Sequence, residues 1–391
     1  MRRLAALALG AALLVACAGA PAQHPNTGAS APPNPGGSAA PGAAGGAANS
    51  LAAAGAATAA VPTAPVPEGR IYPAADDAPV QIKAAWCAVT GAQFPLWLAK
   101  ESGVFARHRI EAEISMIQGS TPAIAALQRG DIDFLECSGG AIAPGLMAGA
   151  EALFIGNFYT GNFFRLMAVP EVESVADLRG RKVAIDRPGD YSNRLNEVLL
   201  ERNGLTPNQD VTLVPIGSQS DRYNALKSGV VDATTVNPPL NLTAQREGYH
   251  EIYNLEDLGI AGISVSLYAT PETVKSRARL VERFLAAMTE TALYAKTHRP
   301  RTMQVMGDYL KLSDREALAG AYDTYATKIA TRLAVPVDAL QAVMDENLKV
   351  NPNAPIRDAA QIIDNRAAEA VANSGFVEVI EAEYGVAPSG R

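Results

Sequence analysis

The chain is poor in the residues that build metal centres and disulfide scaffolds. Its 391 residues include only three cysteines and four histidines, and no two cysteines form a Cys-x-x-Cys pair. Disulfide scaffolds need several cysteine pairs, and structural zinc and iron–sulfur sites need clustered cysteines. We therefore expect neither of these, and the scattered histidines give no basis for a catalytic metal. The sequence predicts no metal and no cofactor.

Long apolar runs and basic runs are also missing. The chain has 33 basic and 40 acidic residues, a net charge of −7. Non-specific nucleic-acid binding depends on basic side chains that neutralise phosphates, so nucleic acid is excluded as a partner. No stretch beyond the N-terminus approaches the roughly 18 apolar residues of a membrane span. The length is sufficient for two domains.

The N-terminus has the pattern of an export signal. Arg2 and Arg3 precede an apolar run over residues 4–16, which is too short for a membrane span and typical of a signal peptide at residues 1–16. Residues 14–17 (LVAC) resemble the bacterial lipobox, which implies cleavage before Cys17 and lipidation of that cysteine. The alternative is an ordinary signal peptide with an incidental cysteine.

Residues 17–79 are predicted to be a tether. The segment 18–67 has no charged residue and consists mainly of alanine, glycine and proline. Such a segment has too few large apolar side chains to offset the entropy of ordering. We expect disorder from Cys17 to residue 79, and regular patterning begins at Val80.

The remaining chain alternates predicted strands and helices in two similar units. In the first unit, strands at residues 80–88, 110–117 and 132–137 enclose a helix at 94–102 and a helix that Ser120 or Thr121 caps. The second unit has strands at residues 182–186, 211–216 and 231–236, with helices that open near Ser192 and Ser220. Residues 126–133 (ALQRGDID) parallel residues 225–232 (ALKSGVVD). This alternation predicts an α/β fold with two lobes.

The segments outside the two units have different patterns. Residues 152–158, 163–169 and 263–270 are rich in β-formers and can carry the chain between lobes. From residue 271 onward we expect helices, at residues 280–297, 314–330, 337–350 and 358–373, separated by Pro300, Pro336, Pro352 and Pro355.

Four segments together resemble one family of proteins. They are residues 94–105 (FPLWLAKESGVF), residues 119–122 (GSTP) followed by 130–133 (GDID), residues 177–184 (DLRGRKVA) and residues 189–192 (GDYS). In order and spacing they are similar to ABC-transporter substrate-binding proteins for nitrate, sulfonates, taurine and pyrimidine precursors of thiamine (NitT/TauT, SsuA/THI5-like).

The resemblance implies a fold, a function and partners. The fold is the two-lobed type II periplasmic-binding-protein architecture, with sheets in the order 2-1-3 plus a returning strand and a helical C-terminal extension. Lobe 1 would hold residues 80–165 and 268–391, and lobe 2 residues 166–267. A monomer anchored by lipid to the extracytoplasmic face of a membrane would bind a small polar or anionic molecule. It would deliver this molecule to ABC permease and ATPase subunits. The implied ligand classes are sulfonates, nitrate-like ions, aromatic carboxylates and pyrimidines.

Helix starts at strand ends give the candidate ligand site, because ligands of open α/β sheets bind there and helix N-termini favour anions. The candidates at helix starts are Ser120, Thr121, Ser138, Gly139, Asp190, Tyr191 and Ser192. Further candidates are Gln93 and Phe94, which follow the first strand, and Tyr159 at the first crossing between the lobes. The family resemblance adds Asn237, at the end of a strand of lobe 2. Each helix start can also be a simple N-cap, and Tyr191 an exposed turn residue. Arg165, Arg187 and Arg194 are weighed as partners for an anion, with surface ion pairs as the alternative.

Two other function classes stay open. The first is an enzyme on the same fold, of the pyrimidine-synthesis or menaquinone-pathway type. The former uses a cysteine-rich motif that this chain lacks, and the lipobox contradicts the cytoplasmic location of the latter. The second is a receptor that passes ligand occupancy to a membrane sensor. The sequence predicts no enzyme but does not separate transport from sensing.

Cys87 and Cys137 end two neighbouring strands of the inferred sheet, roughly 4.8 Å apart. Export permits a disulfide there. Adjacent parallel strands seldom orient their Cβ atoms for a bond, so two buried thiols are the favoured state.

The lipid anchor gives a first testable prediction. We expect Cys17→Ala to release the protein from the membrane fraction or to block its maturation, because no thiol remains to be acylated. Fractionation of cells followed by immunoblotting measures this. Unchanged membrane association of the variant would refute lipidation at Cys17.

Overall fold

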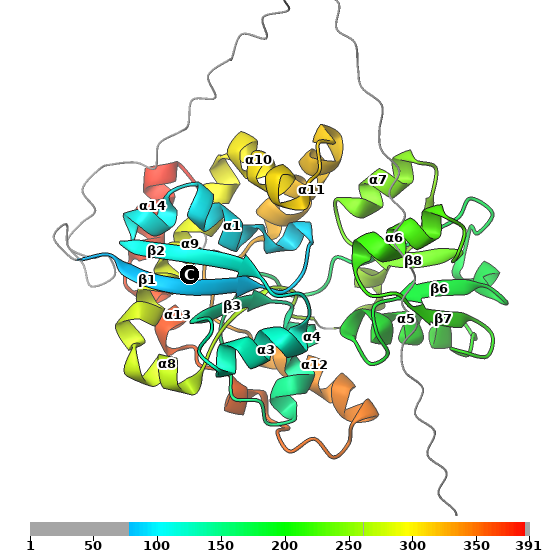
Figure 1. The fold of residues 1–391 in the computed structure, drawn as a ribbon, viewed down its shortest axis with the longest axis horizontal. Coiled ribbons are helices and arrows are strands. Elements are labelled where there is room, and N and C mark those ends of the chain that lie inside the picture. Colours follow the sequence, from blue (N-terminus) through cyan, green and yellow to red (C-terminus); the bar gives the residue numbers. More distant parts are fainter. Residues whose placement is uncertain (1–77, 261, 388–391) are drawn as a thin grey trace, which may run out of the picture. The chain divides into compact units, whose positions relative to one another are not determined.

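The computed structural model describes residues 78–260 and 262–387, which fold around two five-stranded sheets (Figure 1). The first sheet has the order β2 (Ile110–Met116), β1 (Val80–Trp86), β3 (Phe134–Cys137), β10 (Ser266–Ala269) and β4 (Leu153–Asn157). The second has the order β7 (Thr212–Pro215), β6 (Lys182–Ile185), β8 (Ala233–Val236), β5 (Arg165–Ala168) and β9 (His250–Asn254).

One strand in each sheet runs against its neighbours. β10 is antiparallel to β3 and β4, and β5 is antiparallel to β8 and β9. The expected order 2-1-3 with a returning strand is therefore confirmed in both sheets. We call the first sheet with its helices lobe 1 and the second sheet with its helices lobe 2. The returning strands begin at Arg165 and Ser266, slightly before the lobe limits predicted from the sequence.

Helices cover both faces of each sheet (Figure 1). The helices of lobe 1 are α1 (Phe94–Glu101), α2 (Val104–Arg107), α3 (Ser120–Gln128), α4 (Gly139–Met147), α8 (Pro271–Ser276), α9 (Ala278–Thr297), α10 (Arg299–Leu310), α11 (Arg315–Lys328), α12 (Val337–Val350), α13 (Arg366–Asn373) and α14 (Phe376–Tyr384). Those of lobe 2 are α5 (Tyr191–Arg202), α6 (Gln219–Lys227) and α7 (Leu240–Arg246). Short 3-10 turns are η1 (Gly91–Gln93), η2 (Val175–Leu178), η3 (Leu255–Leu258) and η4 (Ala359–Ile362). No helix within the described ranges is long and apolar enough to cross a membrane.

The repeated octapeptide forms the same structure in both lobes. Gly130 and Gly229 end α3 and α6 in the left-handed conformation, with φ of 74° and 71°. Three residues later, Asp133 accepts a hydrogen bond from the backbone N–H of Lys83 at 2.8 Å, and Asp232 accepts one from Lys182 at 2.8 Å. Each aspartate thus fastens the third strand of its unit to the first, which explains why both repeats end in this residue.

Several elements differ from the sequence prediction. The helix predicted at residues 358–373 is the turn η4 followed by α13, and α7 and α10 were not predicted. Pro300 was expected to separate helices, but it lies in the first turn of α10, where the missing N–H of proline costs no helical hydrogen bond. Strand β9 was not predicted, because its residues are mostly polar and partly exposed at the edge of the second sheet.

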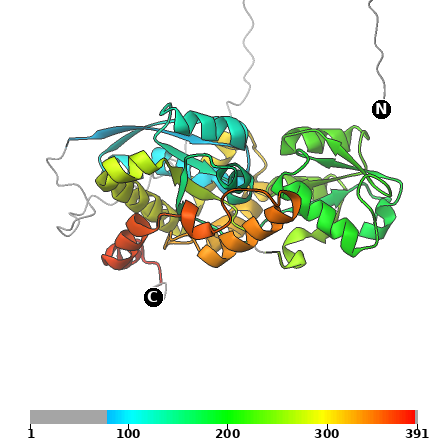
Figure 2. The ribbon, with the colours of Figure 1, turned by 90° about the horizontal axis from the view of Figure 1, so that it is seen from below.

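A buried carboxylate joins the C-terminus to the core of lobe 1. Glu290 of α9 lies 2.8 Å from Nε2 of His108 and 2.8 Å from the hydroxyl of Tyr384 in α14. Arg107 pairs with Glu290 at 3.2 Å and with Glu383 at 2.6 Å. The C-terminal helices, red in Figure 1 and Figure 2, therefore pack on lobe 1 as part of its fold.

The expectation of two buried thiols is wrong, because Cys87 and Cys137 form a disulfide with their Cα atoms 5.2 Å apart. The register pairs Trp86 with Glu136, so the two cysteines are the next residues on neighbouring strands. Cys87 lies just beyond the end of β1, where the chain leaves the ladder, and the constraint that regular parallel pairing imposes on the Cβ atoms no longer applies there.

The disulfide gives a second prediction. It closes a separation of 50 residues, so the unfolded chain loses conformational freedom and the fold gains about 2–4 kcal/mol. We expect the double variant C87A/C137A to lose that free energy of unfolding in urea titration. Alkylation should modify neither cysteine of the wild-type protein until reductant is added, as read by mass. Two alkylated thiols in unreduced protein would contradict the bond.

Candidate ligand-binding site

Helix starts from the two lobes meet at one junction. Gly140, in the first turn of α4, lies so close to Tyr191 that a Cβ on it would be 2.6 Å from Cγ of that ring. A Cβ on Gly119, before α3, would be 3.0 Å from a guanidinium nitrogen of Arg187 in lobe 2. The structure therefore brings the predicted segments 119–121, 138–140 and 189–192 together, one side from lobe 1 and the other from lobe 2.

Two small cavities lie between the lobes. One of about 70 Å³ lies between Tyr191 and Glu197 of α5 and Glu346 of α12. The other, of about 50 Å³, lies between Thr90 of lobe 1 and Ser220 and Asn237 of lobe 2. Asn237 and the start of α6 therefore face lobe 1, as the candidate site requires.

The predicted capping of these helices is only partly correct. Ser120 and Thr121 do not cap α3, because Gly119 holds the N-cap position and Ser120 is the first helical residue. Ser138 and Asp190 are the N-caps of α4 and α5, but neither side chain accepts a backbone hydrogen bond. The cap of α6 is Ser218, whose hydroxyl accepts from the N–H of Asp221 at 3.2 Å.

The residues at the start of α1 are more deeply placed than expected. Gln93 is buried, and its amide oxygen accepts from the N–H of Cys87 at 3.2 Å. Phe94 is fully buried in the core of lobe 1. Tyr159 is also buried, and its ring packs edge-on against Phe163 at 5.2 Å. Of these three, only Tyr159 lies on a segment that links the lobes.

The linking segments pair with each other and form the hinge. Thr160 and Ile263 form an antiparallel bridge, and the N–H of Gly161 donates to the carbonyl of Gly262 at 2.6 Å. The N–H of Ser264 donates to the carbonyl of Tyr159 at 3.0 Å. The two crossings between the lobes therefore lie side by side, the arrangement that hinge closure uses.

Lobe 2 carries a charged cluster at the carboxyl ends of its strands. Arg222 is buried, donates to the carbonyl of Thr235 at 3.0 Å and lies beside Asp186 and Asp190. Burial lowers the pKa of Arg222 to about 10, against the effect of these carboxylates. Burial and the neighbouring Asp186 raise the pKa of Asp190 to about 6, although Arg187 and Arg222 counteract them.

Three residues of this region were not predicted from the sequence. Arg222 gave no signal, since an arginine in the first turns of a helix resembles a surface residue. Tyr325 of α11 reaches across the junction and donates to the carbonyl of Pro238 at 3.0 Å. Glu136 is 1% exposed in β3, and its carboxylate accepts from the N–H of Leu96 at 3.0 Å. A single acid in a four-residue apolar strand was a signal that could have been used.

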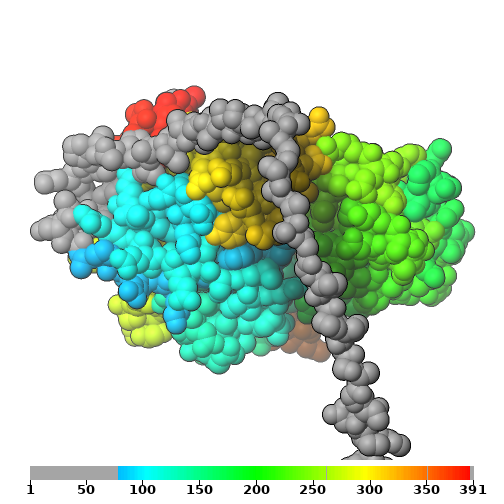
Figure 3. Space-filling view, turned by 45° about the horizontal axis from the view of Figure 1, so that its top comes forward, coloured from blue at the N-terminus to red at the C-terminus, as the bar shows by residue number. Residues whose placement is uncertain are grey.

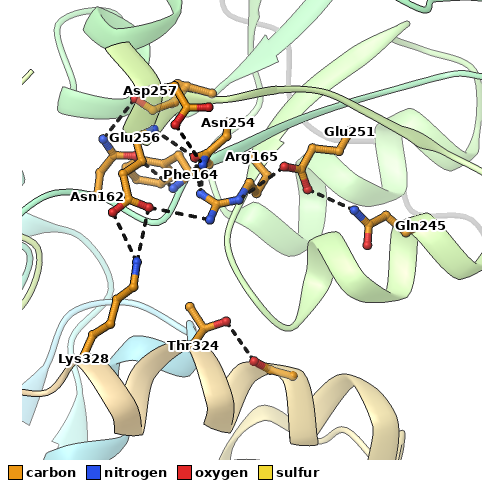
Figure 4. A network of polar contacts seen from close by, with 12 residues as sticks. Asn162, Phe164, Arg165, Gln245, Glu251, Asn254, Glu256, Asp257, Thr324 and Lys328 are labelled. Carbon is orange, nitrogen blue, oxygen red and sulfur yellow. Dashed lines mark hydrogen bonds and ion pairs between the residues drawn. The ribbon is translucent and has the colours of Figure 1, made fainter. Parts of the chain in front are cut away.

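Two of the three arginines weighed for an anion are engaged elsewhere. Arg165 donates to Asn254 at 2.5 Å and lies 3.4 Å from Glu251, within the network of Figure 4. Arg194 pairs with Glu197 on its own helix at 3.3 Å. Arg187 alone lies at the junction, with its Nε 3.8 Å from Asp186.

Ion pairs at the periphery also connect the lobes. In Figure 4, Lys328 of α11 lies 3.2 Å from Glu256 of η3. On the face drawn in Figure 3, an orange part of lobe 1 adjoins the green surface of lobe 2. Arg246 of α7 pairs with Asp314 and, at 3.2 Å, with Glu316 at the start of α11.

Comparison with known proteins relates this geometry to one family. The sequence model of the NMT1/THI5-like family matches residues 92–301, more than half of the chain. A protein of Brucella abortus named as a binding protein is 24% identical over 221 residues, which is 55% of this chain and 67% of the relative.

Solved structures show the same two-lobed fold. The alkanesulfonate-binding protein SsuA of Xanthomonas axonopodis pv. citri, bound to MOPS, is 18% identical with a TM-score of 0.62, covering 74% of this chain and 99% of that one. The nitrate-binding protein NrtA of Synechocystis is 14% identical with a TM-score of 0.64, covering 78% and 92%. The desulfurization enzyme DSZB is 18% identical with a TM-score of 0.58, covering 75% and 99%.

Gly140 gives a third prediction. In Gly140→Leu the added side chain would meet Tyr191, and overpacking of this kind costs about 1–3 kcal/mol. We expect the lobes to separate, with a larger radius of gyration in solution scattering and an unchanged circular dichroism spectrum. Ala148→Leu, at the exposed C-terminal end of the same helix, is the control. A scattering curve identical to that of wild type would contradict the close contact.

Proposed function

The chain belongs to the NMT1/THI5-like family, and from that premise we propose that it is an extracytoplasmic solute-binding protein without catalytic turnover. It captures one small polar or anionic organic molecule between its lobes and delivers it to an ABC permease with its ATPase. A lipid on Cys17 anchors it to the membrane, and residues 18–79 tether the folded part; apart from the last two of these residues, this segment lies outside the described ranges.

One observation carries this proposal. Helix starts from both lobes converge at a junction whose hinge is a pair of bonded crossings. A ligand in that place contacts both lobes at once when they are closed. Its binding therefore favours the closed state, by the difference between its binding free energies for the closed and open states. The relatives named as binding proteins support the same reading.

The enzyme alternative is the weaker one, although DSZB shows that the fold can hold an enzyme. Both described cysteines are joined in a disulfide. Among the described histidines, His108 is buried against Glu290, His298 stacks on Tyr294 at 3.8 Å, and His250 lies on an edge strand. In residues 78–260 and 262–387, no group of three or more acidic, histidine or cysteine side chains is placed to hold a metal.

The function gives a fourth prediction. Native mass spectrometry of the purified protein should show a co-purifying small molecule, and its removal should increase the radius of gyration. Ser192→Trp should abolish retention, because Ser192 lies in the first turn of α5 at the junction. Glu201→Trp, near the far end of the same helix, should retain the molecule.

The same experiment separates the two function classes. A binding protein returns the bound molecule unchanged after incubation with pure protein. Chemical conversion of that molecule would refute the proposal and establish an enzyme. A sensing role would appear instead as normal uptake of the solute in a deletion strain, together with loss of its transcriptional response.

A further inference from the structure

A carboxyl group of the chain already occupies the start of helix α1. Glu136 sits on β3, between Trp86 of β1 and Leu267 of β10, in the middle of the first sheet. Its Oε2 accepts from the N–H of Leu96, the third residue of α1, at 3.0 Å. Helix N-termini favour anions. The N-terminus of α1 therefore already has a carboxylate of the protein beside it and does not need an anion from the ligand.

Two polar atoms beside it are left without a partner. Among the described residues, Oε1 of Glu136 and the hydroxyl of Tyr159 are buried and form no hydrogen bond. Tyr159 belongs to the core cluster that also holds Leu267, the residue paired with Glu136 across the sheet. Buried polar atoms are paired in the great majority of cases, and each exception needs an explanation. Tyr159 lies on the hinge, where the N–H of Ser264 bonds to its carbonyl. Its ring centroid lies 6.0 Å from that of Tyr325, whose hydroxyl reaches lobe 2, so Tyr159 lies beside the lobe junction.

Aromatic rings surround this position. Tyr159 packs edge-on against Phe163 at 5.2 Å, and Phe163 packs edge-on against Tyr325 at 4.9 Å. The hydroxyl of Tyr325 bonds to Pro238 of lobe 2, so the aromatic group connects the two lobes. Burial raises the pKa of Glu136 well above its usual range. A cation beside the carboxyl would offset that cost, and aromatic faces attract cations as well.

Two arginines of lobe 2, Arg222 and Arg187, already lie beside carboxylates of the chain. Arg222 donates to the carbonyls of Gly217 and Thr235 and lies beside Asp186 and Asp190. The Nε of Arg187 lies 3.8 Å from Asp186 and 4.0 Å from Asp190. An oxyanion placed here would compete with these carboxylates, whereas a hydrogen-bond donor would not.

We propose that Glu136 and Tyr159 bind a hydrogen-bond-donating nitrogen group of the solute, an amine or an amidine. The inference rests on the proposed function and names the chemical class of its ligand. Such a ligand would differ from those of the alkanesulfonate-binding and nitrate-binding proteins described above. Sulfonate and nitrate groups accept hydrogen bonds but donate none.

Matched probes test the class of ligand. Benzamidine and benzenesulfonate share a ring and differ in the head group. We expect benzamidine to raise the melting temperature of ligand-stripped protein in a concentration-dependent way and benzenesulfonate to leave it unchanged. Isothermal titration calorimetry then gives the dissociation constant of benzamidine for each variant.

Two substitutions test the residues. In Glu136→Gln the amide oxygen can still accept from Leu96, but its NH₂ group faces the donor of the ligand. A charge-assisted bond is lost, and we expect affinity for benzamidine to fall about 10- to 100-fold. Tyr159→Phe removes one hydroxyl and should weaken binding by about 2- to 10-fold. The control is Glu113→Gln on the exposed face of β2, which should bind as wild type.

The outcomes separate this inference from the proposed function. Stabilisation by benzenesulfonate, stabilisation by neither probe, or unchanged affinity of a folded Glu136→Gln variant would overturn the inference. If Glu136→Gln fails to fold, Tyr159→Phe decides in its place. A co-purified solute that is lost in Ser192→Trp but kept in both of these variants would leave the binding protein intact and refute only the donor-nitrogen ligand.

Discussion

The arrangement of the molecule depends on the pairing of its two interlobe crossings. The bridge between Thr160 and Ile263, with the bonds of Gly161 and Tyr159 to the returning chain, holds both crossings together. Because the two links are bonded side by side, the lobes have a common axis about which they can rotate. Other contacts between the lobes include Gly140 on Tyr191 and Tyr325 on Pro238.

The sheets of the two lobes are fastened in the same way. Asp133 and Asp232 tie the third strand to the first at equivalent positions, and the disulfide adds a covalent tie at the other end of β1 and β3. The buried Glu290 binds the C-terminal helices to lobe 1.

The sequence predicted the fold better than the site, for a physical reason. Strands and helices follow from periodicity and from glycines such as Gly130 and Gly229, which are local signals. The site depends on depth and on partners from distant segments. Gln93 and Phe94 stand at the expected strand end, yet the chain turns them into the core. Glu136 and Arg222 gain their importance only from burial, and a sequence window does not show what covers a residue.

The pairs formed by Lys328 with Glu256 and by Arg246 with Asp314 and Glu316 have a further consequence. They join the lobes at the solvent-exposed rim, where mobile ions screen charges over about 8–10 Å at physiological salt. Their contribution to holding the two lobes together therefore depends on the ionic strength of the surroundings. At low ionic strength these pairs hold the lobes together more firmly, and at high ionic strength less firmly. The buried polar groups at the junction are little affected.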